Sequence, residues 1–205
     1  MKGSKKLFVL CATTLTLSLL GCAPFQANVS TPVSTQSTTN TSINAPVTLK
    51  TKILFINTSR NPRGNTYAMG ETFLQGVPHD TLFLNDYKIY QLGQHISDDQ
   101  FNDVLHIIAQ ADTIVIGTPI YWHTMSGGLK TFIDRLYELD RPVGALQGKK
   151  LYFLTQGMAP TEDEKSQLSF IFSRVANRYN MEFMGAATDP DNMSALQNVL
   201  HKNLN

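Results

Sequence analysis

The chain is nearly free of cysteine. Among its 205 residues only Cys11 and Cys22 are cysteines, and both lie within the first 22 positions. Residues 23–205 therefore contain no disulfide, no thiolate metal ligand and no cysteine nucleophile. The five histidines show no metal-ligand spacing, so the sequence predicts no metal site.

A surplus of charge of one sign is also missing. The chain has 17 basic and 16 acidic residues, and its formal net charge at pH 7 is +1. Nucleic-acid binding needs a basic face, so we expect no nucleic-acid partner. The Gly-Lys-Ser/Thr ending of a P-loop and the Gly-x-Ser-x-Gly of a nucleophile elbow are both absent, which argues against nucleotide hydrolysis and serine-based acyl transfer.

The first 22 residues have the composition of an export signal. Three lysines precede an apolar run over residues 7–20, which is shorter than the roughly 20 apolar residues of a membrane-spanning helix. The run ends in Leu19-Leu20-Gly21-Cys22, which resembles the bacterial lipoprotein signal. The resemblance implies cleavage after Gly21 and diacylation of Cys22. The alternative is an ordinary secretory signal in which Cys22 is incidental.

The following segment is expected to be a disordered tether. Residues 23–49 carry no charge and are rich in Ser and Thr, so they bury too little apolar surface to offset their ordering entropy. We therefore divide the chain into a lipoprotein signal peptide at 1–21, a tether at 22–49 and a folded domain at 50–205. Lipidated Cys22 would hold this domain at the extracytoplasmic face of the cell membrane.

Short apolar runs alternate with helical periodicity throughout the folded domain. Strands are predicted at residues 52–57, 81–84, 113–117, 151–154 and 181–184. Helices are predicted over 65–75, from Ser97 with a capping box to Gln100, over an apolar stripe from Leu129 to Leu136, from Thr161 with a capping box to Glu164, and from Pro190 after the cap Asp189. The alternation predicts an α/β fold, a flavodoxin-like three-layer sandwich with a five-stranded parallel sheet in the order 2-1-3-4-5. In such sheets ligands bind beyond the carboxyl ends of the strands.

The loop after the first strand is polar and leads into a helix N-terminus. It offers hydroxyls at Ser59 and Thr66, an amide at Asn65, a flexible Gly64, and two guanidinium groups at Arg60 and Arg63. Free N–H groups at a helix N-terminus bind anions, so this loop fits a phosphate monoester. The alternative is a polar loop without a ligand, capped by Asn65.

The loop after the third strand, residues 117–128, is unusually aromatic. It holds Tyr121, Trp122, His123 and Met125 at the carboxyl end of a strand, and Trp122 is the only tryptophan of the chain. Such a loop suggests a flat apolar ligand, and Ser126 is placed to cap the next helix. The alternative is that the aromatic side chains only cover the edge of the core. The loop after the fourth strand, Thr155-Gln156-Gly157-Met158, is less specific, although glycine permits a close backbone approach.

Two of these segments resemble a known family. Residues 52–66, with their phosphate-type loop, are similar to the NADPH-dependent FMN reductase family of flavodoxin-like proteins. Residues 111–135, with Thr-Pro-Ile-Tyr-Trp and Met-Ser-Gly-Gly-Leu-Lys-Thr-Phe-Ile-Asp-Arg, are similar to the second flavin loop and helix of that family. The likeness extends more weakly over residues 50–185. Thr58 stands where the family usually has glycine.

The resemblance implies FMN as a non-covalent cofactor. Its phosphate would be held by the loop of Ser59, Gly64, Asn65 and Thr66, with one of Arg60 or Arg63. Its isoalloxazine ring would be lined by Pro119, Ile120, Tyr121, Trp122, His123, Met125 and Ser126, and closed on the far side by Gln156 and Gly157.

The sequence therefore predicts an FMN-dependent oxidoreductase of the NAD(P)H:flavin or quinone type, anchored outside the cytoplasmic membrane. The redox chemistry belongs to FMN, and no catalytic side chain is assigned. The expected partners are a small-molecule electron donor, for which NAD(P)H is a candidate, and a small-molecule acceptor; a homodimer is in keeping with relatives. The alternative is a non-catalytic FMN-binding electron-relay module of the cell envelope, since nicotinamide cofactors are scarce outside the cytoplasm.

Overall fold

The computed structural model describes residues 52–139 and 144–204. The predicted signal peptide, the tether and Cys22 lie outside these residues. None of the described helices combines the length and the apolar character needed to cross a membrane.

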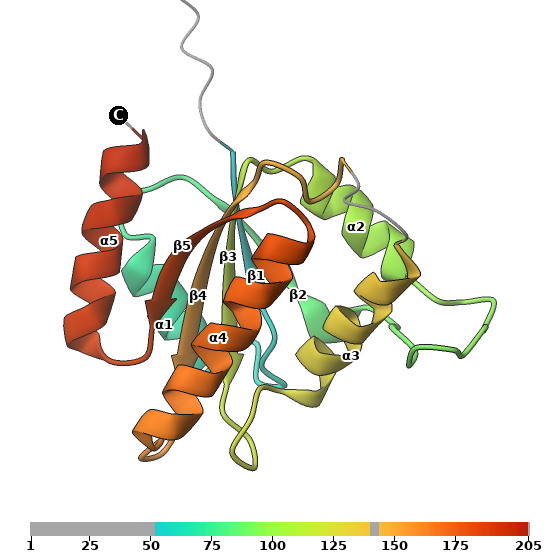
Figure 1. Ribbon diagram of the computed structural model, residues 1–205, viewed down its shortest axis with the longest axis horizontal. Coiled ribbons are helices and arrows are strands. Elements are labelled where there is room, and N and C mark those ends of the chain that lie inside the picture. Colours follow the sequence, from blue (N-terminus) through green and yellow to red (C-terminus); the bar gives the residue numbers. More distant parts are fainter. Residues whose placement is uncertain (1–51, 140–143, 205) are drawn as a thin grey trace, which may run out of the picture. The chain divides into compact units, whose positions relative to one another are not determined.

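A parallel sheet of five strands forms the middle layer (Figure 1). The strands are β1 (Ile53–Asn57), β2 (Asp80–Phe83), β3 (Thr113–Pro119), β4 (Lys150–Gln156) and β5 (Glu182–Ala187). Their order is β2-β1-β3-β4-β5, and all four neighbouring pairs are parallel, which confirms the predicted topology. Every residue of β1 and β3 is buried, as expected for central strands covered on both faces.

Helices form the two outer layers. On one face lie α1 (Asn65–Phe73) and α5 (Pro190–Leu204), and on the other lie α2 (Phe101–Ala109), α3 (Gly127–Arg135) and α4 (Glu162–Arg178) (Figure 1). Two short 3-10 helices, η1 (Leu84–Asp86) and η2 (Leu136–Glu138), follow β2 and α3.

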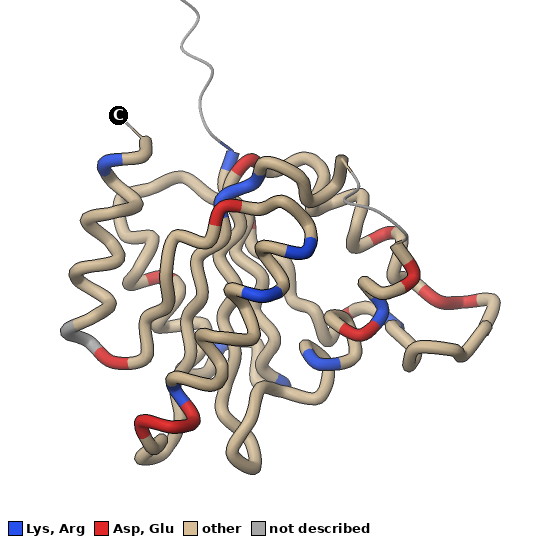
Figure 2. Tube along the Cα trace, viewed as in Figure 1, with Lys and Arg blue, Asp and Glu red and all other residues tan. Residues whose placement is uncertain are grey.

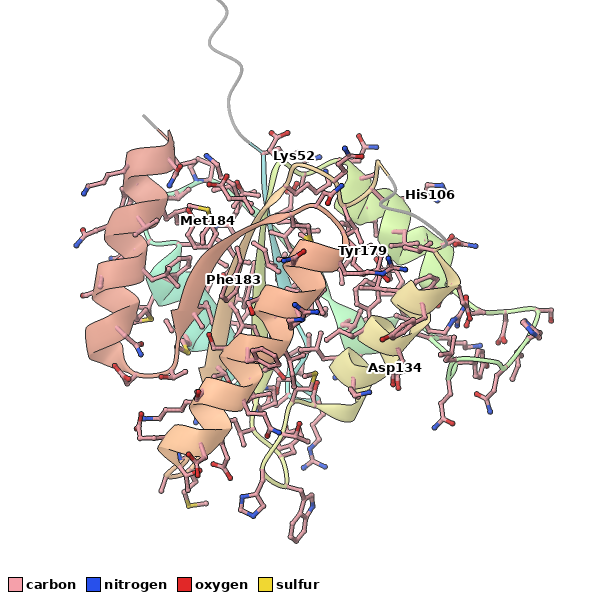
Figure 3. The ribbon with its side chains drawn as sticks, in the orientation of Figure 1. Lys52, His106, Asp134, Tyr179, Phe183 and Met184 are labelled. Atoms are coloured by element: carbon pink, nitrogen blue, oxygen red, sulfur yellow. The ribbon has the colours of Figure 1, made fainter. Side chains whose placement is uncertain are left out.

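Successive strand residues belong to different halves of the core. In β1, Phe55 packs with the apolar side chains of α1 and α5, whereas Ile56 packs with those of α2, α3 and α4. In β5, Phe183 lies against the α2–α4 half and Met184 against the α1–α5 half (Figure 3). The two faces are therefore covered by independent apolar clusters.

Three predicted helix caps are confirmed. Thr161 and Glu164 form both bonds of a capping box at α4. The Asp189 carboxylate accepts a hydrogen bond from the Asn192 N–H (2.9 Å) at the start of α5. The Ser126 hydroxyl accepts from the first turn of α3.

The capping box predicted at Ser97 and Gln100 is wrong, because α2 begins at Phe101 and its N-cap makes no side-chain bond. The side-chain oxygen of Gln100 accepts from the Lys88 N–H (2.9 Å) and is not available to the helix. The Phe101 N–H at the start of α2 donates instead to the Asp99 carboxylate (2.9 Å).

Residues 87–100 form an irregular segment that projects beyond the sheet but is tied to α3 (Figure 1). The Asp99 carboxylate accepts from Arg135 Nη1 (2.6 Å) and from the Tyr90 N–H (3.0 Å). The Arg135 guanidinium also lies 4.6 Å from the centre of the Phe101 ring. The hydrogen bond from Arg135 is the main cause that lowers the pKa of Asp99 to about 2.

Candidate functional site

Three loops meet at the carboxyl edge of the sheet, at the lower end of the view in Figure 1. The Thr58 N–H donates to the Gly117 carbonyl (3.0 Å), which joins the β1–α1 loop to β3. The Ile120 N–H donates to the Gln156 carbonyl (2.8 Å), which joins the β3–α3 loop to the end of β4. The three loops expected to form the site are therefore contiguous.

Side chains within the β1–α1 loop set its shape. The Asn57 amide oxygen accepts from the Ser59 N–H (3.0 Å), and the Asn57 amide nitrogen donates to the Pro62 carbonyl (3.0 Å). The Ser59 hydroxyl accepts from the Asn61 N–H (3.2 Å), and the Asn61 amide oxygen accepts from the Arg63 N–H (3.3 Å). These bonds span two to five residues, so the loop is organised locally.

The N-terminus of α1 has no side-chain cap. Its N-cap is Gly64, which has an extended conformation, and Asn65 is the first helical residue. The alternative in which Asn65 caps the helix is therefore wrong. No acidic residue lies in the first turn, so its N–H groups form a donor set that suits an anion.

Thr66 connects α1 to the end of β4. The Gln156 side-chain nitrogen donates to the Thr66 hydroxyl oxygen (3.2 Å), and Thr66 is buried. A Cβ at Gly117 would lie 3.0 Å from the Thr66 Cγ2 methyl and 2.8 Å from the Phe55 ring. Glycine at position 117 thus allows α1 to approach β3 closely.

The two arginines of the β1–α1 loop have different surroundings. The Arg63 guanidinium lies 4.4 Å from the centre of the Tyr67 ring and 5.5 Å from that of Phe83, so it is engaged in cation–π contacts. Arg60 is exposed and forms no ion pair with any residue that the structure describes. This geometry favours Arg60 over Arg63 for a contact with a phosphate.

Thr58, which stands where the resembled family usually has glycine, is bonded into the site through its backbone and its side chain. Its side chain is fully buried, and its hydroxyl donates to the Gly117 carbonyl (3.0 Å). The same hydroxyl oxygen accepts from the Ser126 hydroxyl (3.1 Å), and the Ser126 N–H donates to the Thr118 hydroxyl (3.1 Å). Thr58 is therefore part of a buried polar network that joins the first and second loops.

The β3–α3 loop has a buried part and an exposed part. Pro119, Met125 and Ser126 are buried, and Met125 packs in the α2–α4 half of the core. Ile120 is half-buried, and a Cβ at Gly157 would lie 2.9 Å from the Ile120 Cβ, so the second and third loops touch. The residues predicted to line the ring therefore differ in exposure, from the buried Pro119, Met125 and Ser126 to the half-buried Ile120.

The exposed part, residues 121–124, is called the aromatic hairpin below. Tyr121 and Thr124 exchange two backbone hydrogen bonds (2.8 and 3.2 Å). Trp122 and His123 at the tip have φ angles of 49° and 66°. Trp122 is 93% exposed, in contrast to an aromatic side chain that covers the core edge. The alternative in which Trp122 only covers the core is therefore wrong.

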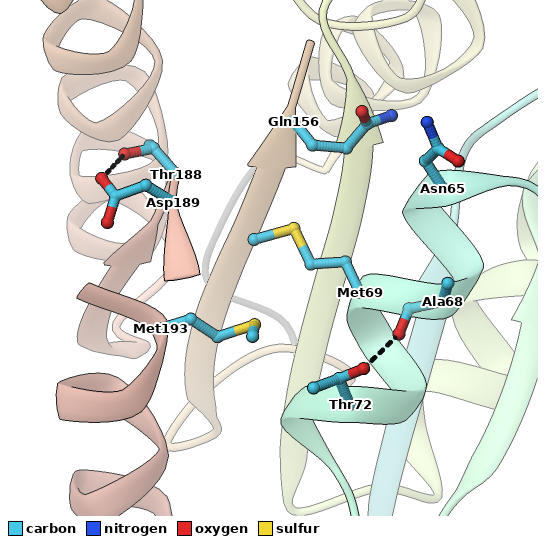
Figure 4. A pocket seen from close by; sticks show the side chains of 8 residues that line it. All are labelled: Asn65, Ala68, Met69, Thr72, Gln156, Thr188, Asp189 and Met193. Carbon is cyan, nitrogen blue, oxygen red and sulfur yellow. Dashed lines mark hydrogen bonds between the residues drawn. The ribbon is translucent and has the colours of Figure 1, made fainter. Parts of the chain in front are cut away.

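A cavity of about 310 Å³ adjoins the site between α1 and α5 (Figure 4). Asn65 and Gln156 line its upper rim, and the side chains of Met69 and Met193 face each other across it. The cavity adjoins the predicted cofactor site, because Asn65 is predicted to contact the phosphate and Gln156 the ring.

The described residues hold no cluster of three or more His, Cys, Asp or Glu side chains suited to a metal ion. His106, for instance, lies on the outer surface of α2, away from the site (Figure 3). Fold and site together define a flavodoxin-like protein in which a polar loop before an uncapped helix N-terminus lies beside an aromatic loop.

The model of the NADPH-dependent FMN reductase family matches residues 51–184, and the chain belongs to this family. This is the family that residues 52–66 and 111–135 resemble, so the family predicted from the sequence is confirmed.

Curated relatives match part of the chain. YwqN of Bacillus subtilis, a candidate NAD(P)H-dependent FMN-containing oxidoreductase, is 34% identical over 92 residues, which cover 41% of this chain and 51% of the relative. An iron-sulfur flavoprotein of Archaeoglobus fulgidus is 34% identical over 97 residues, covering 41% and 48%. The chain thus spans about half the length of these relatives. Its residues 23–205 have no cysteine to ligate an iron–sulfur cluster.

Solved structures support the fold. The Trp repressor binding protein from Bacillus subtilis is 24% identical and superposes with a TM-score of 0.59, covering 72% of this chain and 97% of that one. The apo form of an NADH:FMN oxidoreductase is 20% identical, with a TM-score of 0.58 over 74% and 87% of the two chains.

Proposed function

We propose that the protein is an FMN-dependent NAD(P)H oxidoreductase that passes electrons to flat acceptors of the flavin or quinone type. The observation that supports this most directly is the hydrogen bond between Thr66 and Gln156. It brings the uncapped N-terminus of α1 and the end of β4 together, so that a phosphate and a flat ring can bind side by side.

The described residues fit FMN by the chemistry of their donors. The hydroxyls of Ser59 and Thr66, the amide groups of the first turn of α1 and the Arg60 guanidinium would hold the phosphate. Ile120, the backbone at Gly157 and the aromatic hairpin would border the ring. When bound, FMN supplies the electron-transfer chemistry of the site.

Bonds within the chain hold the two cofactor loops in place relative to each other. The buried bonds of Thr58 and Ser126 fix the β3–α3 loop against the β1–α1 loop, so the two parts of the cofactor site keep a constant spacing. Ser126 also caps α3, whose N-terminus favours negative charge nearby.

We expect Thr66→Ala to weaken FMN binding about tenfold, because a hydrogen bond to a charged group contributes roughly 1.5–3 kcal/mol. Titration of the purified protein by flavin fluorescence measures the dissociation constant. Thr66→Ser retains the hydroxyl and is expected to bind FMN nearly as the unaltered protein does. Riboflavin, which lacks the phosphate, should respond little to either change. An equal loss for riboflavin and FMN would show that Thr66 does not contact the phosphate.

Rapid bleaching of the flavin absorption band by NADPH or NADH under anaerobic conditions is the expected result for an oxidoreductase. Stopped-flow mixing of the FMN-loaded protein with each donor measures it, and dithionite serves as a control for reducibility. Bleaching by dithionite alone would instead favour the alternative, an electron-relay module without a nicotinamide site.

We propose in addition that the domain forms a homodimer. We further propose that it is anchored through lipidated Cys22 at the extracytoplasmic face of the cell membrane. The support for the anchor is the Leu19-Leu20-Gly21-Cys22 sequence after an apolar run. Metabolic labelling with a fatty acid should mark the protein and place it in the membrane fraction, and Cys22→Ala should abolish the label. Unlabelled protein in the medium would contradict the anchor.

A further inference from the structure

The tip of the aromatic hairpin adopts a backbone conformation that its residues disfavour. Trp122 and His123 both have positive φ angles, as in a type I′ turn, where glycine and asparagine are the usual residues. The turn therefore needs support from contacts outside the hairpin.

His123 supplies such a contact. Its Nδ1 atom meets a carboxylate oxygen of Glu164, in the first turn of α4, 41 residues further along the chain. The second carboxylate oxygen of Glu164 accepts from the Thr161 N–H (2.7 Å), and the Glu164 N–H donates to the Thr161 hydroxyl (3.3 Å). Glu164 is thus held by the capping box and provides a fixed anchor for His123.

The hairpin is consequently attached at both ends. At its base, the Ile120 N–H donates to the Gln156 carbonyl, and at its tip His123 contacts Glu164. Both attachments lead to the β4–α4 region, one at the end of β4 and one in the first turn of α4. Trp122 lies between them and remains 93% exposed, so the faces of its indole are free to stack on another ring.

We propose that His123 and Glu164 are positioning residues that hold Trp122 over the mouth of the flavin site, where the indole stacks on a planar aromatic electron acceptor. The proposal rests on the proposed function for the nature of the acceptor. The contact that positions Trp122 is made between two residues of the protein itself.

The first experiment uses the full chain without FMN. Trp122 is the only tryptophan, so time-resolved fluorescence anisotropy reports the local motion of the hairpin. His123→Asn keeps a residue that tolerates positive φ but shortens the side chain, and Glu164→Gln keeps a capping-box residue while removing the charge. Both variants are expected to increase the amplitude of fast indole motion.

Glu162→Gln is the matched control. Glu162 lies in the same helical turn, and its carboxylate pairs with Lys165 (2.7 Å) instead of His123; Figure 2 shows this acidic turn at the lower end of α4. The control should leave the anisotropy decay unchanged. An unchanged decay in His123→Asn, or an equal change in Glu162→Gln, would overturn the positioning role whether or not the protein binds FMN.

The second experiment uses the FMN-loaded protein with an uncharged quinone. His123→Asn is expected to raise KM about two- to tenfold, the range of one aromatic stacking contact, and to change kcat less than KM. Trp122→Ala should have a similar effect, Trp122→Phe a smaller one, and the double variant Trp122→Ala/His123→Asn no more than Trp122→Ala alone. Additive effects of the two substitutions would show that His123 does not act through Trp122.

Discussion

Replacing Gly70 with alanine is expected to lower the free energy of unfolding by about 3 kcal/mol. Gly70 lies in α1 against β1, and a Cβ there would sit 2.2 and 2.3 Å from two carbons of the Phe55 ring. Phe55 is fully buried, so the ring has no room to withdraw. The free-energy cost of this steric overlap is larger than the stabilisation of about 1 kcal/mol that alanine brings to a helix relative to glycine. Urea denaturation monitored by circular dichroism measures the change.

Gly127→Ala is the matched control for this substitution. Gly127 is the first residue of α3, and a Cβ there would meet no atom within 4 Å, so stability should change by less than about 0.5 kcal/mol. Phe55→Leu should partly restore the Gly70→Ala protein, because it removes the ring that causes the overlap. If the stability losses of Gly70→Ala and Phe55→Leu simply add in the double variant, the overlap with Phe55 is not the cause of the Gly70→Ala loss.

Asp99→Ala should destabilise the domain by about 2–3 kcal/mol at neutral pH. Its carboxylate accepts from Arg135, Tyr90 and Phe101, and the Arg135 side chain is only 8% exposed. Without Asp99, the guanidinium keeps only Glu138 as an acidic partner among the described residues. Thermal or urea unfolding gives the loss.

Because of the lowered pKa of Asp99, we expect the stability of the domain to depend on pH. Because Arg135 lowers the pKa of Asp99 from 3.8 to about 2, the ionised form contributes stability above pH 3.8, amounting to about 2 kcal/mol. This contribution is lost as the pH falls towards 2, so the difference between the unaltered protein and Asp99→Ala should shrink over that interval.

Asp98→Ala provides a neighbouring control. Asp98 pairs with Lys88 (2.7 Å), but both side chains are about half exposed or more, so the loss of stability should be much smaller than at Asp99. A loss at Asp98 equal to that at Asp99 would mean that burial of Arg135 is not what makes Asp99 important.

The sequence predicts the bounds of a strand well where apolar residues are continuous, and less well for the edge strand β5. The core of β3 reads Thr-Ile-Val-Ile-Gly, and its predicted residues 113–117 lie within the observed strand. β5 extends to Ala187, beyond the predicted residues 181–184. It is a half-buried edge strand with an irregular register opposite Leu151 and Tyr152. Gly185, which has a φ of 131°, interrupts its apolar residues, so the predicted strand ends before it.

The start of α2 could not be predicted for a related reason. The Ser97–Gln100 spacing satisfies the local rule for a capping box, but Gln100 bonds to Lys88, 12 residues earlier in the chain. A contact over that distance depends on how residues 87–100 fold back, which local spacing does not encode.

The sequence by itself determined the alternation of strands and helices, the polar character of the β1–α1 loop and the family of the protein. These features depend on neighbours a few residues apart, as in the bonds of Asn57, Ser59 and Asn61. Only the tertiary structure decided which residues join the three loops. The bonds from Gln156 to Thr66, from Ser126 to Thr58 and from His123 to Glu164 span 90, 68 and 41 residues. They exist because β1, β3 and β4 are adjacent in the sheet, so their carboxyl ends bring distant side chains within hydrogen-bonding distance.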